Sequence, residues 1–327
     1  MLSRRLMLHL GAACAALVLA GPARAPLAAD LDTVTLDWAY YNPVSLVLKQ
    51  EGWLEEALKP DGIEVQWVQS LGSNKAIEFL NAKGVQFGST AGAAALLARV
   101  ANSPLRSVYV YSRPEWTALV TRPDTGIAKV EDLKGKRVAV TRGTDPYIFL
   151  LRTLAQHGLT EKDIVPVLLQ HADGRAALEA KQVDAWAGLD PMMAQTELEK
   201  GSILFFRNPE ANTWGVLNVR EEFAAEHPEI VERVIKVYER GRAWAKENPD
   251  GLRAILAKAA KLDDKVAARQ LERTDFTTAA IGEPQEASIL AAGKALQEAG
   301  VIKADVDVPA TVEALLDADF TQKLAVK

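Results

Sequence analysis

The 327-residue chain contains a single cysteine and only four histidines. The cysteine, Cys14, lies in an N-terminal segment that we expect to be removed, so the mature protein has no thiol for disulfides or nucleophilic chemistry. His157, His171 and His227 stand at no helical spacing from another metal ligand. The sequence therefore indicates neither a metal site nor a cofactor.

Motifs for phosphate binding and for hydrolysis are also missing. The segment 134–137, Lys-Gly-Lys-Arg, lacks the serine or threonine that completes a phosphate loop, and we find no dinucleotide-binding glycine fingerprint. The segment 88–92, Gly-Ser-Thr-Ala-Gly, has a threonine where a nucleophile elbow needs a serine. These absences disfavour a hydrolase, and the hydroxyls of 88–92 are better suited to donating hydrogen bonds to a bound anion.

The first 29 residues have the pattern of a secretory signal peptide. Arg4 and Arg5 precede an apolar run at 6–19, which is too short to span a bilayer, and small residues follow. We expect cleavage near Ala29. Export would follow the general secretory route or, given the paired arginines, the twin-arginine route. Because Cys14 lies in the middle of the apolar run, a lipoprotein is disfavoured. The chain is therefore predicted to be exported.

The rest of the chain is acidic. Removing residues 1–29 takes away three arginines and no acidic residue, so the formal charge changes from −5 to −8. This charge argues against nucleic acid or an anionic membrane as a partner. No second apolar run is long enough to cross a membrane. The remaining length of about 298 residues favours two lobes over a single core.

Strand and helix signals alternate from residue 33 to about residue 200, which predicts an α/β fold with largely parallel strands. Several short apolar strands run into small polar turns and then helices. In an open α/β sheet such turns lie at the carboxyl ends of the strands, where ligands bind. Unpaired N–H groups and positive dipole ends of helices would meet there, which predicts an anion site. The five strand–turn–helix segments cover residues 34–43, 65–73, 85–92, 138–147 and 183–191.

The alternation pauses twice, near residues 113–116 and 208–213. We interpret the strands that follow, 117–121 and 214–219, as crossings between two lobes. After Arg220 the pattern is helical, and these helices are expected to pack on the first lobe. The predicted organisation is a signal peptide at 1–29, lobe 1 at 30–120 and 213–327, and lobe 2, inserted into lobe 1, at 121–212.

The turn 142–147, Arg-Gly-Thr-Asp-Pro-Tyr, is the most specific candidate for an anion contact. It follows the short strand 138–140 and leads into a helix that starts near Pro146, whose first N–H groups point outward. Arg142 would add a fixed cation with fork geometry. We therefore expect the substitution Arg142→Ala to remove much of the affinity for any anionic ligand.

These segments resemble the periplasmic substrate-binding proteins of ABC importers, in particular the branch for aliphatic sulfonates, taurine and related anions. The resemblance covers essentially the whole mature chain. It implies the two-lobe periplasmic binding protein fold of type II, with the lobes joined by two crossover strands and closing around one small solute. It also implies an ABC permease and ATPase as partners, and we expect a monomer. The resemblance is carried by residues 38–43, 88–90, 132–147, 183–191 and 226–230.

The resemblance implies that the turns at 142–144 and 89–90 contact the anionic head, and that Tyr41, Asn42 and Asp190 line the cleft. Tryptophans near the strand ends suggest an apolar slot beside the anion site. The predicted ligand-binding residues are Tyr41, Asn42, Ser70, Gly72, Ser89, Thr90, Arg142, Gly143, Thr144, Asp145, Tyr147, Trp186, Asp190 and Trp214.

Two departures from the family leave the cargo open. The segment 91–93, Ala-Gly-Ala, replaces a Gly-Glu pair common in sulfonate binders, and Leu189 stands where an aromatic residue often precedes the Asp-Pro pair. Loss of the carboxylate disfavours an amino-bearing ligand such as taurine and suits an apolar or aromatic tail. We expect an aliphatic or aryl sulfonate, with nitrate, bicarbonate, an aromatic carboxylate or a thiamine-precursor pyrimidine as alternatives.

Two other classes of protein are built on related scaffolds. An enzyme of this kind would rely on cysteine or histidine clusters that the mature chain lacks, and export argues against a biosynthetic role. The effector module of a transcription regulator would need an N-terminal helix-turn-helix in place of the signal peptide. The sequence therefore predicts a receptor and no enzyme.

Overall fold

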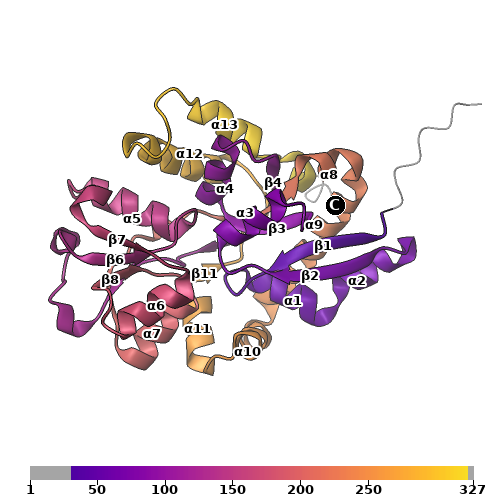
Figure 1. Ribbon diagram of the computed structural model, residues 1–327. Helices are drawn as coiled ribbons and strands as arrows, with labels where there is room; N and C mark the ends of the chain where they lie inside the picture. Colours follow the sequence, from indigo (N-terminus) through magenta and orange to yellow (C-terminus); the bar gives the residue numbers. More distant parts are fainter. Residues whose placement is uncertain (1–30, 323–327) are drawn as a thin grey trace, which may run out of the picture. The chain divides into compact units, whose positions relative to one another are not determined.

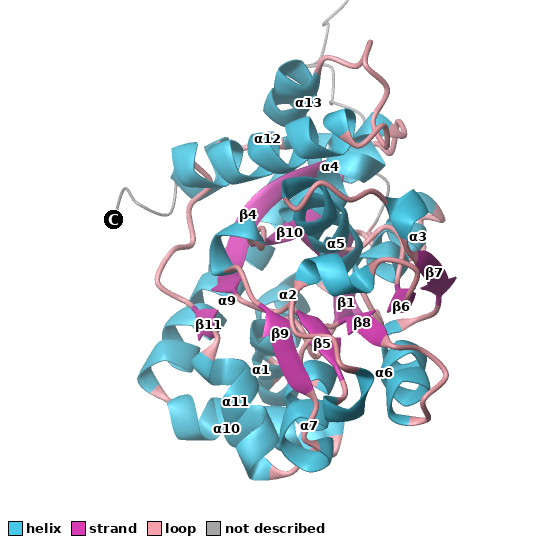
Figure 2. Ribbon diagram, turned by 90° about the vertical axis from the view of Figure 1, so that its left-hand side faces the viewer, coloured by secondary structure: helices cyan, strands magenta, loops and turns pink. Residues whose placement is uncertain are grey.

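The computed structural model describes residues 31–322, in which helices pack around two β-sheets (Figures 1 and 2). The predicted signal peptide at 1–29 lies outside the described residues. Within residues 31–322, no helix combines the length and the apolar character needed to cross a lipid bilayer.

The first sheet has six strands in the order β11-β4-β10-β3-β1-β2. Strand β1 pairs in parallel with β2 and β3, whereas β10 pairs antiparallel with both β3 and β4. The strands are β1 (Thr33–Trp38), β2 (Glu64–Gln69), β3 (Phe87–Ala91), β4 (Leu105–Pro114), β10 (Gly215–Arg220) and β11 (Thr274–Asp275).

The second sheet has five strands in the order β7-β6-β8-β5-β9. Strand β6 pairs in parallel with β7 and β8, whereas β5 pairs antiparallel with both β8 and β9. The strands are β5 (Leu119–Thr121), β6 (Arg137–Val140), β7 (Val165–Leu168), β8 (Ala185–Ala187) and β9 (Ile203–Phe206).

The two sheets have the same plan. The order β2-β1-β3-β10-β4 in the first sheet corresponds to β7-β6-β8-β5-β9 in the second. In both sheets the first three of these strands are parallel and the next one, β10 or β5, is antiparallel to its neighbours. The chain passes from the first sheet to the second between β4 and β5, and returns between β9 and β10. The limits of the predicted lobes remain a proposal, although Leu119 and Val120, which we assigned to lobe 1, pair within the second sheet.

The helices follow the strands along the chain. Helices α12 and α13 pack on α4, whereas α11 packs on α7, which follows the second sheet's strand β8 (Figure 1). Because α12 also contacts α5, the expectation that the helices after Arg220 pack on the first lobe is wrong for α11 and incomplete for α12. The helices are α1 (Pro43–Glu51), α2 (Trp53–Leu58), α3 (Ser73–Asn81), α4 (Gly92–Val100), α5 (Asp145–Gln156), α6 (His171–Glu179), α7 (Met192–Lys200), α8 (Glu221–Glu226), α9 (Pro228–Glu247), α10 (Pro249–Ala260), α11 (Asp264–Glu272), α12 (Glu283–Glu298), α13 (Val308–Leu315) and α14 (Asp319–Gln322).

The local sequence explains several of these boundaries. Helix α9 starts with Pro228 in its first turn, and its apolar residues at 230, 231, 234 and 235 are all buried, as the helical spacing predicts. A single helix was expected from residue 43 to about 58. It is divided at Gly52, which adopts the left-handed conformation (φ 67°) and ends α1.

One predicted turn is a strand in the structure. Residues 88–91 were expected to form a polar turn, but β3 continues to Ala91. Strand β10 pairs along all of β3, from Val219 opposite Phe87 to Gly215 opposite Ala91. The expected turn is therefore wrong because a neighbour distant in sequence supplies ladder hydrogen bonds there. Strands β4, β7, β9 and β11 were not predicted, and the pause expected at 113–116 begins inside β4.

Candidate functional site

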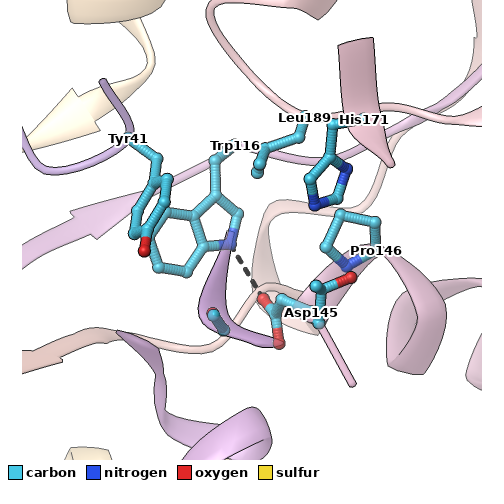
Figure 3. A pocket seen from close by; sticks show the side chains of 8 residues that line it. Tyr41, Trp116, Asp145, Pro146, His171 and Leu189 are labelled. Atoms are coloured by element: carbon cyan, nitrogen blue, oxygen red, sulfur yellow. Dashed lines mark hydrogen bonds between the residues drawn. The ribbon is translucent and has the colours of Figure 1, made fainter. Parts of the chain in front are cut away.

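Two adjoining cavities lie where loops of both sheets meet, and they share Tyr41, His171 and Leu189. The inner cavity has a volume of about 10 Å³, and the outer one about 210 Å³. Figure 3 shows Trp116 between Tyr41 and His171 in the inner cavity, with Asp145 beside them. The inner cavity is lined by Tyr41, Ser73, Trp116, Thr144, Asp145, Pro146, His171 and Leu189.

The outer cavity is more apolar. Its walls include Leu71, Leu189, Met192 and Leu262 alongside the rings of Tyr40 and Tyr41. The full lining is Tyr40, Tyr41, Ser70, Leu71, Gln170, His171, Ala172, Leu189, Asp190, Pro191, Met192, Gln195, Ala260 and Leu262. A polar inner end and an apolar outer end suit a ligand with an oxygen-rich head and a hydrocarbon tail.

Three helices begin at the inner cavity, and they come from both sides of the cleft. Ser73 is the first residue of α3, Asp145 of α5 and His171 of α6, and all three line the cavity. None of the three helices has a side-chain cap at its N-terminus. The first N–H groups of a helix have no partner within the helix, and the dipole makes this end positive. The arrangement is therefore suited to an anion.

The starts of these helices lie very close together. A Cβ atom on Gly72, the N-cap of α3, would be 3.0 Å from His171 Nε2 of α6. A Cβ atom on Gly143, next to the α5 N-cap, would be 3.4 Å from Cβ of Asn74 in α3. Gly72 (φ 148°) and Gly143 (φ 75°) both have backbone conformations that favour glycine. Glycine at these two positions lets α3 approach α5 and α6.

The helices that follow the other three predicted turns use protein acceptors instead. The expectation that all five turns offer free amides is therefore wrong for α1, α4 and α7, where protein oxygens accept hydrogen bonds from first-turn N–H groups. The bonds are Ser45 N to Asn42 Oδ1 (3.2 Å), Gly92 N to Trp214 O (2.9 Å), Ala93 N to Thr213 Oγ1 (3.1 Å) and Ala194 N to Asp190 Oδ1 (2.8 Å).

A buried carboxylate behind the cleft binds several predicted site residues. Asp37 Oδ1 accepts from the backbone N (2.8 Å) and Oγ (2.8 Å) of Ser89, and its Oδ2 accepts from Ser70 Oγ (2.6 Å). Tyr41 donates from its hydroxyl to Ser89 O (2.9 Å), and Asn42 Nδ2 donates to Ser89 Oγ (2.7 Å). Burial raises the pKa of Asp37 to about 6. Ser89 and Asn42 therefore support the cleft from behind, while Tyr41 and Ser70 reach its wall.

Four further predicted residues do not line either cavity. Thr90 Oγ1 accepts from Asn218 Nδ2 (2.8 Å) and is fully buried. Trp186 is fully buried in the core of the second sheet. Trp214 packs in the main core, with the guanidinium of Arg113 5.3 Å from its ring centre. Tyr147 donates from its hydroxyl to Glu161 (3.3 Å). The hydroxyls of Thr90 and Tyr147 therefore have protein partners and both tryptophans pack in cores, although Trp186 Nε1 has no hydrogen-bond partner there.

Arg142 also lies away from the cavities. Its side chain is 54% exposed and its Nη2 lies 3.0 Å from Glu161 Oε1. This hydrogen bond is the main reason why its pKa is raised. The neighbours of Arg142 in sequence, Thr144 and Asp145, do line the inner cavity. The structure thus brings the predicted turn to the site but turns the guanidinium towards Glu161.

We accordingly expect Arg142→Ala to change the affinity for an anionic ligand by less than about fivefold, because the guanidinium lies away from the cavities and its exposed ion pair contributes only ~0.2–1 kcal/mol. Calorimetric titration of both proteins at low ionic strength provides the measurement, with Glu161→Gln as the matched control. A loss of two orders of magnitude would contradict this placement and return Arg142 to the site.

Asp145 connects the site to both segments that join the sheets. Its Oδ2 accepts from Trp116 Nε1 (2.8 Å) and from Thr213 N (2.9 Å), and its Oδ1 accepts from Thr213 Oγ1 (2.7 Å). Trp116 lies between β4 and β5, and Thr213 between β9 and β10. Burial raises the pKa of Asp145, while these three hydrogen bonds act in the opposite direction. Its carboxylate thus fixes the start of α5 to both connections.

Asp190 lines the outer cavity as predicted, and it pairs with a cation that sequence reasoning did not identify. Its Oδ2 lies 3.4 Å from Arg273 Nη1, and Arg273 also pairs with Glu197 of α7. Burial raises the pKa of Asp190 to about 7. Among the described residues that line the two cavities there is no lysine or arginine. Charge at the site is therefore limited to carboxylates and helix dipoles.

His171 is the most informative lining residue that sequence reasoning did not select. Its Nδ1 lies 3.3 Å from Thr141 Oγ1, and its Nε2 is buried with no hydrogen-bond partner. Burial lowers its pKa to about 3. Ser73, Trp116, Pro146 and Leu189 were likewise absent from the predicted set. The signal for His171 was its position after a short apolar strand at 165–168, the same pattern as the five selected turns.

Metal binding has no support in the part of the chain that the structure describes. No group of three or more His, Cys, Asp or Glu side chains between residues 31 and 322 could hold a metal ion.

Solved structures show the fold. The alkanesulfonate-binding protein SsuA from Xanthomonas axonopodis pv. citri, bound to MOPS, aligns with a TM-score of 0.80 at 23% identity, over 89% of this chain and 99% of that one. The desulfurization enzyme DszB aligns with a TM-score of 0.66 at 16% identity, over 89% of this chain and 98% of that one. The predicted two-lobe periplasmic binding protein fold is confirmed.

Sequence comparison shows the family. A protein from Bacillus subtilis (strain 168) that is named for binding aliphatic sulfonates is 26% identical over 233 residues, which cover 70% of this chain and 70% of the relative. The family described as NMT1/THI5 like matches residues 45–252, which is more than half of the chain. The chain, with its helix starts gathered around a small cleft, therefore belongs to the NMT1/THI5-like family.

Proposed function

We propose that this protein is the periplasmic solute-binding component of an ABC importer and that it captures a small organic anion, an aliphatic or aryl sulfonate. The observation that carries the proposal is the meeting of the uncapped starts of α3, α5 and α6 at one small cavity. Three oxyanion oxygens can accept from N–H groups that have no acceptor inside their own helices.

The buried polar groups around the cleft support this assignment. Asn74 Oδ1, Gln170 Oε1 and His171 Nε2 are buried and have no hydrogen-bond partner in the protein. Native proteins leave few such atoms unpaired, so groups of this kind beside a cavity are ready to bind a ligand. The side-chain amides of Asn74 and Gln170 can each turn to donate.

The size of the expected affinity follows from these contacts. A carboxylate or sulfonate group near a helix N-terminus gains ~0.3–1 kcal/mol from each dipole, and charge-assisted hydrogen bonds add more. Together with burial of an apolar tail in the outer cavity, a free energy of binding of about −8 kcal/mol is expected, which corresponds to micromolar Kd.

Relatives support the sulfonate class. The Bacillus subtilis relative is named for aliphatic sulfonates, and the structure of the Xanthomonas protein contains MOPS, a sulfonate with a ring at its other end. The apolar lining of the outer cavity here, with Leu71, Met192 and Leu262, suits the hydrocarbon tail of an aliphatic sulfonate. We propose that the protein acts as a monomer that delivers its cargo to a membrane permease and its ATPase.

We further propose that the protein binds without turnover, although DszB has a similar fold. The chain has no cysteine after Cys14. The hydroxyl that contacts His171 belongs to Thr141, and it donates to Leu169 O (2.7 Å). Because that proton is engaged with a backbone carbonyl, His171 has no activated nucleophile in this arrangement.

The test is a thermal-shift screen followed by calorimetry. We expect 1-hexanesulfonate and MOPS to raise the Tm, and hexanoate, taurine, sulfate and nitrate to raise it less at equal concentration. A ligand at about one hundred times its Kd adds about 2.7 kcal/mol to the free energy of unfolding. Buffers that are themselves sulfonates must be excluded. A Tm that responds to nitrate but to no sulfonate would overturn the proposed cargo.

A further inference from the structure

The orientation of His171 fixes which of its ring nitrogens carries a proton. Thr141 Oγ1 donates its proton to Leu169 O at 2.7 Å, so this oxygen can only accept from His171 Nδ1 at 3.3 Å. The neutral imidazole therefore carries its proton on Nδ1 and presents a lone pair at Nε2. That lone pair lies beside the start of α3, 3.0 Å from the Cβ position of Gly72.

A lone pair in this place conflicts with an anionic ligand. Sulfonate oxygens are acceptors only, so they gain nothing from the Nε2 lone pair and are repelled by it. Asp145 lines the same cavity, and its carboxylate already has three protein donors. Since no lysine or arginine lines either described cavity, a buried anion has no side-chain cation to pair with.

We infer, on the basis of the proposed function, that the protein binds its anion together with one proton, which His171 takes up on Nε2. The resulting imidazolium donates from Nε2 to the ligand and from Nδ1 to Thr141. The proton comes from solvent, and no covalent bond to the ligand forms. His171 thereby becomes the cation of the site, and the site has this cation only when an anion is present.

The empty and occupied sites then differ in proton affinity. In the empty site burial holds the pKa of His171 at about 3, so the ring is neutral at any pH near neutrality. An anion in contact with Nε2 raises this pKa, because an opposite charge within a few ångströms favours the charged form. Between the two pKa values the affinity falls as pH rises, by up to about tenfold per pH unit.

Other titratable groups lie near His171. Burial raises the pKa of Tyr41, so its hydroxyl keeps its proton near neutral pH. Arg175 of α6 approaches Glu179 and Gln195, and Glu197 of α7 pairs with Arg269 and Arg273. Asp190, with a pKa of about 7, and Asp37, with a pKa of about 6, are competitors that could also take up a proton near neutral pH. The charged or titratable groups on the lining and on the packed elements are Asp37, Tyr40, Tyr41, Lys75, Glu78, Arg137, Asp145, Asp173, Arg175, Glu179, Asp190, Glu197, Glu199 and Lys200.

The experiment counts protons directly. Mixing the protein with 1-hexanesulfonate, whose charge is constant over this range, in weakly buffered solution at about pH 5 should take up a large part of one proton for each ligand bound, because contact with an anion raises the pKa of His171 only part of the way from about 3 towards neutrality. Calorimetric titrations between about pH 4 and 6 should show the affinity falling by about tenfold or more as the pH rises. Hexanesulfonate that binds without proton uptake would overturn the inference and leave the proposed function standing.

Variants assign the proton to a residue. In His171→Gln, uptake should disappear and the affinity should no longer depend on pH, because the amide donates without titrating. The control His157→Gln changes a histidine that pairs with Glu131 at 2.9 Å and lines neither cavity, and it should behave as the unmodified protein does. Uptake that persists in His171→Gln but disappears in Asp190→Asn would overturn the assignment to His171.

The outcomes separate the two proposals. Absence of hexanesulfonate binding at every pH would overturn the proposed function, whatever the proton count. If His171→Gln does not fold, the proton count and pH profile of the unmodified protein still decide whether binding is proton-coupled.

Discussion

Replacing Gly72 with alanine is expected to weaken binding of a sulfonate by about 100-fold. The added Cβ would lie 2.8 Å from Asn74 Oδ1 and 3.0 Å from His171 Nε2, and the φ of 148° is one that alanine rarely adopts. Backbone strain of this kind costs ~1–3 kcal/mol. The methyl group would also push the start of α3 away from the start of α6. These are two of the three uncapped helix ends, so the anion could no longer contact both. Calorimetric titration with 1-hexanesulfonate measures the loss.

Gly62→Ala is the matched control for this substitution. Gly62 also has a positive φ (73°), but a Cβ there has no atom within 4 Å. It should lower the free energy of unfolding by about 1 kcal/mol through strain alone and leave ligand affinity unchanged. If Gly72→Ala bound hexanesulfonate as tightly as the unmodified protein, the ligand would lie elsewhere than between α3 and α6.

The second large effect is expected on stability, from Asp145→Ala. The substitution leaves Trp116 Nε1, Thr213 N and Thr213 Oγ1 without their acceptor in a buried place. Each unsatisfied buried donor costs ~1–3 kcal/mol, although the hydroxyl can turn to another acceptor. We expect the free energy of unfolding in urea to fall by about 4 kcal/mol. Ligand affinity should fall as well, since Asp145 begins α5.

Asp124→Ala provides the comparison, because Asp124 is an exposed aspartate with ion pairs to Arg122 and Lys181. Its loss should change the unfolding free energy by less than about 1 kcal/mol. Asp145→Asn should fall between the two, since the amide keeps one acceptor. Equal stability of Asp145→Ala and Asp124→Ala would show that the two connections are not held by this carboxylate.

The fold could be predicted from the sequence because its signals are local. Strands such as β1 and β6 are short apolar runs followed by polar turns and helices, and Pro228 and the spacing after it mark α9. The edge strand β7, with Val165 and Leu168 about half exposed, is apolar in sequence like the others but contains Pro166, a residue that argues against a strand. Missing β7 meant missing the helix start that places His171 at the cleft.

Side-chain partners explain the remaining differences at the site. Gly72, Thr144, Asp145 and Asp190 lie at the cleft because the backbone alone brings turns to the carboxyl ends of strands. Whether a side chain at such a turn faces ligand or protein depends on residues far away in sequence. Thr90 Oγ1 accepts a hydrogen bond from Asn218 Nδ2, and no local sequence pattern predicts that bond.

Arg142 illustrates the same limit for charge. Its sequence context, beside a glycine at the start of a helix, is typical of an anion-binding cation. At the surface, Glu161, nineteen positions later in the sequence, instead accepts a hydrogen bond from the guanidinium of Arg142. No local feature of the sequence distinguishes a ligand from a protein carboxylate as the partner of this side chain.

Strand β10 has a consequence for how the polypeptide matures. It lies between β3 and β4, so the hydrogen bonds of both depend on residues 215–220 that emerge from synthesis after the entire second sheet. Strands β1 to β4 cannot complete the first sheet by themselves, because β10 is missing between β3 and β4. Strands β6 to β9 can pair with one another and with β5 as soon as they are synthesised. The sheet whose strands come first along the chain is therefore the one completed last.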